Sequence, residues 1–287
     1  MQILPRLLLA FLVGLPACST QQIIAQMSAP LMKGQYVSIH AETDLELARA
    51  AIPANLKMLE GLLHGDKNNL DILKNLAEGF CGYAFSFVEG EDPERASQLY
   101  LRGRGYAQRA LALAGPVDNL AGLVPDAFQD AMEKMGKDQL PYLFWFGHCW
   151  SGWLALNLHN PSALAAISKQ EWLMRRVMAM DENYYYAGPH FFFGAFYGSR
   201  SRLLGGDPEK SRFHFEKNLA LTDNRFLLTH LFYAKTYAVQ TQDRKLFERL
   251  LNTVLQTPLD VLPNEGLANK VAKVKAQKLL DKADDLF

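Results

Sequence analysis

The stretch LDILKNLAEGFCGYAFSFVEGEDPERASQLY, residues 70–100, decides the fold class. Its first half repeats apolar or small side chains at intervals of three and four, the spacing of one buried helical stripe. Its second half begins a helix, because Asp92 can accept free backbone amides, Pro93 needs no amide partner, and Glu94 faces the positive end of the dipole. Two helices joined by a turn are predicted. The stripe consists of Leu70, Leu73, Leu76, Ala77, Phe80, Cys81 and Ala84.

The same pattern recurs along the chain. Asp207-Pro208-Glu209 repeats the helix start, and a second stripe follows with Leu227, Leu231, Ala234 and Ala238. No segment alternates with the period of two that strands require. An all-α fold is therefore predicted, built of irregular helical hairpins that stack like tetratricopeptide (TPR) repeats but have longer connections.

Three segments organise the chain. Residues 1–17 have the features of an export signal, residues 18–42 lack a steady period and suggest a tether, and residues 43–287 form one helical domain without an internal linker. The capping-box spacing of Thr43-Asp44-Leu45-Glu46 marks the start of the domain. Further helix pairs are expected at 138–158 with 161–180 and at 226–240 with 243–256, closed by a helix at 264–284.

The N-terminus predicts a lipid anchor. Arg6 precedes a short apolar run, and Leu15-Pro16-Ala17-Cys18 resembles the bacterial lipobox, so Cys18 is the expected lipid attachment site. Two or more acyl chains on that residue, such as palmitate, would hold the protein to a membrane. A simple signal peptide with an incidental cysteine is the alternative. Ser19 favours the outer membrane over the inner one.

The two remaining cysteines, Cys81 and Cys149, both lie in apolar helical stretches. An oxidising compartment would permit them to pair. A lone cysteine in such a stretch usually behaves as a small buried hydrophobe, so two free thiols are expected.

Charge and motifs exclude several functions. Lys plus Arg and Asp plus Glu both number thirty, which removes the basic excess expected of a nucleic-acid-binding protein. The chain has no GxSxG, HExxH, paired CxxC or glycine-rich phosphate motif, so neither an enzyme nor a cofactor is expected. The histidines lack the spacing of metal ligands, and His40 and His64 are expected to be exposed. No metal site is predicted.

Two aromatic concentrations, at 141–153 and 183–198, are the candidate ligand site. Most of these rings are expected to fill the core, while the tyrosines before Pro189 occupy a turn where they could line a cavity. His190, Arg200 and Arg202 could neutralise a ligand carboxylate, although surface charge is the simpler explanation. The candidate ligand-binding residues are Trp145, Trp150, Trp153, Tyr184, Tyr185, Tyr186, His190, Phe193, Tyr197 and Arg200.

The chain resembles the TatT family, the lipoprotein T components of tripartite ATP-independent periplasmic (TRAP) transporters. The resemblance spans nearly all of the chain from residue 43 and rests on the order and spacing of several motifs. They are Phe80-Cys81-Gly82-Tyr83-Ala84, the segments 91–96 and 99–104, Trp150-Ser151-Gly152-Trp153, 181–190, 205–210 and 267–270. The resemblance implies TPR-like helix pairs, a lipid anchor, a periplasmic solute-binding protein as partner, a homotrimer, and a passage for a hydrophobic ligand. Ala187 departs from the family, where glycine is common.

Two functions follow as hypotheses. The favoured one is a lipid-anchored periplasmic accessory protein that docks a solute-binding protein and holds or passes an apolar small molecule, which could carry an acidic group. The alternative is an envelope scaffold with a TPR-like groove that binds a protein segment and has no small-molecule role. An enzyme is the third and least favoured class.

Overall fold

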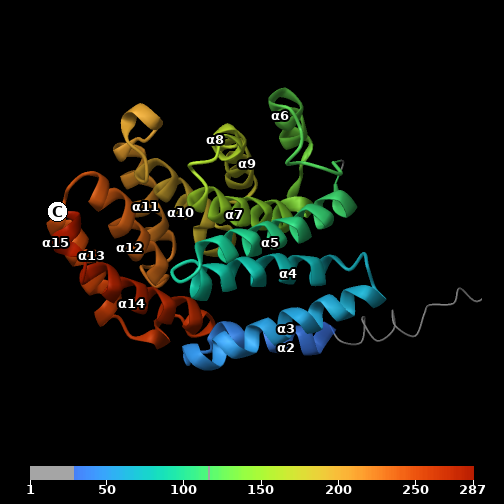
Figure 1. Ribbon diagram of the computed structural model, residues 1–287, viewed down its shortest axis with the longest axis horizontal. Helices are drawn as coiled ribbons and strands as arrows, with labels where there is room; N and C mark the ends of the chain where they lie inside the picture. The colour runs from blue at the N-terminus through green and yellow to red at the C-terminus, as the bar shows by residue number, and fades with distance from the viewer. Residues whose placement is uncertain (1–28, 116) are drawn as a thin grey trace, which may run out of the picture.

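The computed structural model describes residues 29–115 and 117–287 (Figure 1). Within them the protein is all-α and has no strand, which confirms the predicted fold class. The longer helices are α2 (Ala29–Ala41), α3 (Leu45–Gly65), α4 (Leu70–Tyr83), α5 (Pro93–Ala114), α6 (Pro125–Lys134), α7 (Leu140–Leu156), α9 (Ile167–Met180), α10 (Tyr184–Gly198), α11 (Pro208–Leu221), α12 (Leu227–Tyr233), α13 (Arg244–Gln256) and α14 (Gly266–Leu280). Short α8 (Pro161–Ala165) and α15 (Ala283–Leu286) complete the set, together with π and 3-10 turns.

The predicted helix starts are confirmed at both Asp-Pro-Glu motifs. The Asp92 carboxylate accepts the amide of Arg95 at 3.0 Å, and that of Asp207 accepts the amide of Lys210 at 3.1 Å. The start of α3 differs by one residue from the predicted capping box. Asp44, not Thr43, accepts the first free amides of that helix.

Both predicted apolar stripes are buried, and each continues into a π turn that the sequence pattern does not show. One follows α4 at Ala84–Val88 and the other follows α12 at Ala234–Ala238. A π turn inserts an extra residue into the helical ladder, so the three-and-four spacing is locally shifted. Phe85 lies in the first π turn and Phe232 lies just before the second. Their ring centroids are 5.8 Å apart.

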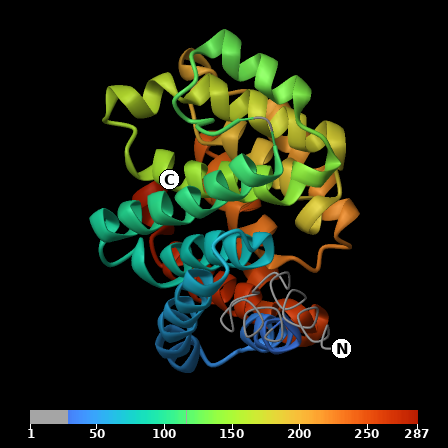
Figure 2. The same ribbon diagram turned by 90° about the vertical axis from the view of Figure 1, so that its right-hand side faces the viewer.

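The expected tether is in part a helix. Residues 29–41 form α2, and its Met32 is buried against α3 and α4. The helix has no regular apolar stripe, because it contributes polar side chains to the interior. The tether was predicted because the sequence of this segment lacks that apolar period. α14 contacts both α2 and α3, and Figure 2 shows α2 beside α14, so the first and last long helices of the described residues meet and close the array.

The expectation of two free thiols is wrong. Cys81 on α4 and Cys149 on α7 form a disulfide that spans 68 residues. Both cysteines are fully buried, as expected, but the packing of α4 against α7 brings their Cα atoms to 5.5 Å. Gly103 on α5 covers the bridge, and a side chain there would collide with the Cys81 sulfur.

No helix among the described residues is both long and apolar enough to cross a membrane. The predicted signal peptide and Cys18 lie outside the described residues.

Candidate functional site

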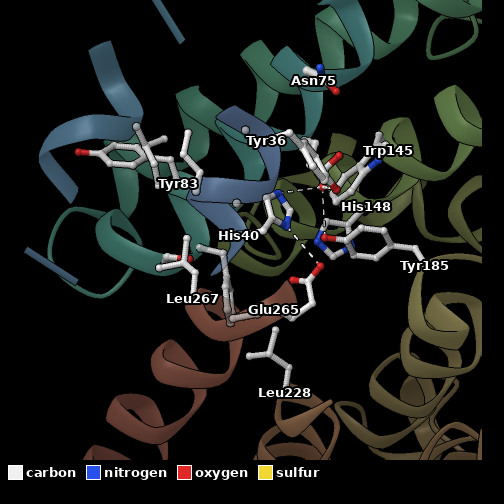
Figure 3. Close-up of a pocket in the computed structure, with 18 of the residues that line it drawn as sticks. Tyr36, His40, Asn75, Tyr83, Trp145, His148, Tyr185, Leu228, Glu265 and Leu267 are labelled. Carbon is white, nitrogen blue, oxygen red and sulfur yellow. Dashed lines mark hydrogen bonds and ion pairs between the residues drawn. The ribbon is translucent and has the colours of Figure 1, made fainter. Parts of the chain in front are cut away.

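A cavity of about 200 Å³ lies where α2, α3, α4, α7, the start of α10, α12 and the start of α14 meet (Figure 3). Its walls are mainly apolar. The aromatic rings that line it come from six segments and include Tyr36, Tyr83, Phe85, Phe144, Trp145, Tyr185, Phe191, Phe226 and Phe232. Such an enclosed, mostly apolar space with a few polar groups is typical of a small-molecule site.

Glycines shape the cavity. A Cβ on Gly79 would lie 2.6 Å from Leu56, and one on Gly188 would lie 2.6 Å from the Phe144 ring. Gly79 therefore lets α3 approach α4 closely, and Gly188 lets α7 approach the start of α10. Gly82 also lines the cavity, but a Cβ there would meet no atom within 4 Å, so it faces open space.

Polar groups gather at one end of the cavity around Glu78 of α4. The hydroxyl of Tyr36 donates to Glu78 Oε1 at 2.7 Å, and that of Tyr185 donates to the same oxygen at 3.2 Å. His40 lies between two carboxylates, 3.4 Å from Glu78 and 3.3 Å from Glu265 (Figure 3). Four helices or turns thus contribute to one hydrogen-bonded cluster.

The ionisation of this cluster follows from its burial. Loss of solvent raises the pKa of Glu78, against the opposing effect of His40 and Lys74. Burial opposes the charged form of His40, but its hydrogen bond to Glu265 and the charge of Glu78 outweigh it, so the pKa of His40 is raised. The neighbouring His148 has no such partner, and burial lowers its pKa to about 4.

The predicted tyrosine turn is present and has an unusual backbone. Tyr185, Tyr186 and Ala187 have φ angles of 46°, 56° and 51°, the left-handed region that non-glycine residues avoid. Asn218 of α11 holds the turn, because its side-chain amide donates to the carbonyls of Tyr186 at 2.8 Å and Ala187 at 2.9 Å. Strained backbone of this kind persists only where its surroundings fix it, and here it directs Tyr185 to Glu78.

The structure brings some of the predicted ligand residues to the cavity. Trp145 and Tyr185 line it, with ring centroids 4.8 Å apart. Tyr186 lines an adjoining hollow that shares Tyr36 and Tyr185. Tyr184 instead packs edge-on against Phe144, with centroids 5.1 Å apart.

The other predicted ligand residues lie elsewhere. Trp150 and Trp153 contact the Arg104 guanidinium, at 5.3 and 5.9 Å, on the other side of α7. Phe193 and Tyr197 pack within the core next to α11.

The three cations proposed to neutralise a carboxylate do not converge. His190 contacts Glu182 at 3.0 Å and His214 at 2.9 Å. Arg200 lies over the Phe196 ring at 3.8 Å, and Arg202 pairs with Glu209 at the surface. None of the three lines the cavity, whose charged groups are two carboxylates and His40.

Several cavity residues escaped the sequence analysis. Glu78 and Lys74 have the spacing of an ordinary surface ion pair, although Glu78 is only 4% exposed. His40 was expected to be exposed, but its side chain is 18% exposed and faces the cavity from α2. The one available signal was Glu78 itself, which lies beside the apolar stripe of α4. Among the described residues no group of three or more His, Cys, Asp or Glu side chains could hold a metal ion.

Comparison with known proteins identifies the family. The profile of the family described as TAtT, TRAP transporter T-component, matches residues 41–287, nearly the whole chain. The protein belongs to this family. A curated relative is an uncharacterised protein of Treponema pallidum (strain Nichols), 21% identical over 284 residues that cover 91% of this chain and 86% of the relative. The match begins at residue 41, the last residue of α2. The part of the cavity wall that α2 forms therefore precedes the matched region.

Proposed function

We propose that this T component is a lipid-anchored periplasmic accessory protein that docks the solute-binding protein of a TRAP transporter and holds an apolar small molecule. The observation that carries the ligand role is the mainly apolar cavity of about 200 Å³. The space is partly open to solvent, and an apolar occupant would remove its mainly apolar walls from water, which is favourable.

The predicted compartment is supported by the disulfide. Stable disulfides are characteristic of exported proteins, because cytosolic reductants keep most thiols reduced. The Cys81–Cys149 bridge therefore agrees with an export signal, and a lipid at Cys18 would hold the domain on the periplasmic side of the envelope. The outer membrane remains our proposed location because of Ser19, and a homotrimer is the proposed assembly because of the family resemblance described above.

A scaffold without a ligand is the second candidate function. Three large apolar side chains on or next to α11 are strongly exposed: Leu203 at 97%, Leu204 at 70% and Phe213 at 59%. Exposed apolar side chains of this size suit a protein contact.

The test combines the anchor and the partner. Cells that express the wild-type protein or Cys18→Ser are labelled with palmitate, and the purified soluble domain of each is then used to capture the solute-binding protein of the transporter. We expect label on the wild type alone and capture of the solute-binding protein by the soluble domain of both. Failure to capture it would overturn the docking role, and equal labelling of Cys18→Ser would overturn the anchor.

A further inference from the structure

The polar end of the cavity contains acceptors that lack donors. Glu78 Oε2 and Gln35 Oε1 are both buried, both residues line the cavity, and neither oxygen has a hydrogen-bond partner. The other oxygen of Glu78 already accepts from Tyr36 and Tyr185. A buried acceptor without a donor costs free energy, and both residues line the cavity, so a ligand that enters it and donates to these oxygens would relieve that cost.

The charged residues that line the cavity favour a cation rather than a neutral donor, because they are Glu78, Glu265 and His40, while Lys74 lies outside the lining. Glu265 lies on the other side of His40, so two carboxylates share one imidazole. Lys74 Nζ lies 3.9 Å from Glu78 Oε2, which is too long for a hydrogen bond, and leaves that oxygen free to accept one. The remaining titratable groups that face Glu78 are Tyr36, Tyr184, Tyr185 and Tyr186, which are neutral donors.

The aromatic residues that line the cavity also favour a cationic ligand. Tyr36, Trp145 and Tyr185 line the cavity close to the carboxylate, and Figure 3 shows them grouped around His40 and Glu265. An ammonium group is attracted to the faces of aromatic rings as well as to a carboxylate. A carboxylate ligand would instead meet Glu78 and Glu265 with like charge.

We propose that the cavity binds an amine, a molecule with an apolar body and a primary ammonium group that donates to Glu78 Oε2. This inference rests on the proposed ligand role and names the class of the ligand. It replaces the acidic head group expected from the sequence, since His190, Arg200 and Arg202 lie away from the cavity.

The test compares three probes of equal chain length: n-octylamine, n-octanol and n-octanoate. Their affinities for the mature protein are measured by calorimetry and by the change in tryptophan fluorescence. We expect octylamine to bind about tenfold more tightly than octanol, since a hydrogen bond to a charged group is stronger than a neutral one, and octanoate to bind most weakly.

Two variants locate the effect. Glu78→Gln keeps the side-chain shape and removes the charge, so it should lower octylamine affinity about tenfold and leave octanol affinity unchanged. The octanol result also shows that this variant folds. Glu60→Gln is the matched control, because Glu60 is a carboxylate that is 8% exposed, does not line the cavity, and is bonded by Lys57, Arg102 and Tyr106. It should keep the wild-type preference.

The pH dependence of amine affinity is an independent test of the inference. Octylamine remains protonated near neutral pH, whereas Glu78 ionises and His40 loses its proton as pH rises, so amine affinity should rise with pH. Equal binding of the three probes, a preference for octanoate, or an unchanged preference in Glu78→Gln would overturn the amine inference and leave the apolar cavity intact. Binding of no probe would overturn the ligand role itself.

Discussion

Within the aromatic stretch 183–198, Phe193 on the helix and Tyr185 in the turn have opposite environments. In the helical half, Phe193 is 1% exposed and is surrounded by rings of α10 and α11. In the turn, Tyr185 lies beside open space and hydrogen-bonds to a carboxylate more than a hundred residues away. Aromatic residues of one stretch therefore fill the core at Phe193 and line a cavity at Tyr185.

Backbone geometry explains the difference. On the helix, Gly194 lets the Phe215 ring approach to within 2.7 Å of where a Cβ would be, so α11 closes all the space around Phe193. In the turn, three left-handed residues interrupt the helix, and the Tyr185 hydroxyl reaches Glu78 of α4. The aromatic content of a segment thus says little about ligand binding until its backbone is known.

Loss of the disulfide should have the largest effect on stability, because the bridge joins α4 to α7 across 68 residues of chain. Replacing both cysteines by alanine should lower the free energy of unfolding by roughly 4 kcal/mol, the entropy of an unfolded loop of this length. Denaturant titration measures the change. Treatment of the wild type with a reductant should reproduce most of it, and an unchanged midpoint in reductant would contradict the account.

Truncation of a ring should cost more in the filled half than at the cavity. We expect Phe193→Ala to lower the free energy of unfolding by about 3 to 5 kcal/mol, because a new void forms in close packing. Phe85→Ala should cost only about 1 to 2 kcal/mol, since that ring is half-buried and already borders open space. Equal losses in thermal or denaturant unfolding would show that the cavity is filled by protein.

The tyrosine turn should depend on Asn218. Asn218→Ala removes two hydrogen bonds to left-handed backbone in a fully buried place and should cost about 2 kcal/mol. Thr229, which donates to Asn218 Oδ1, would also lose its partner. Thr241→Ala is the control, because that hydroxyl bonds only to its own helix turn at the surface. A loss no greater than that of the control would mean that the turn holds its shape unaided.

The stability contributed by the polar end of the cavity should depend on pH because of His40. Its raised folded-state pKa means that protonation stabilises the fold; this stability is complete below the unfolded-state pKa of about 6.5 and is lost as pH rises through the folded-state pKa. We therefore expect His40→Gln to destabilise the protein more at about pH 5.5 than at about pH 8.5. Unfolding curves at both pH values check this, with the exposed His64→Gln as control. A pH-independent loss would contradict the contact with the two carboxylates.

The smallest effect is expected at Ala187. Its φ of 51° suits glycine, so Ala187→Gly should change the stability by about 0.5 kcal/mol in the favourable direction, because relief of strain exceeds the added entropy of the unfolded chain. Ala195→Gly, within regular α10, should instead destabilise by about 1 kcal/mol. The same sign for both variants would argue against a left-handed turn.

Much of the fold was predictable because it depends on local signals. The stripes of α4 and α12 and both Asp-Pro-Glu starts follow from spacing and residue type alone. The disulfide and the cavity were not predictable, since they depend on which helices meet. Glu78 resembles a surface residue in sequence, and only the arrival of α2 and the tyrosine turn encloses it.

The central claim is that the protein encloses a space for a small molecule beside the tyrosine turn. Gly82→Leu tests it most directly, because Gly82 lines the cavity and its side-chain position is open. Gly105→Leu on α5 is the matched control, since its side-chain position is equally open but lies outside the cavity. Native mass spectrometry of protein purified from its own membranes should show one bound molecule on the wild type and on Gly105→Leu, and none on Gly82→Leu. An empty wild type, or a Gly82→Leu protein that is equally loaded, would contradict the account.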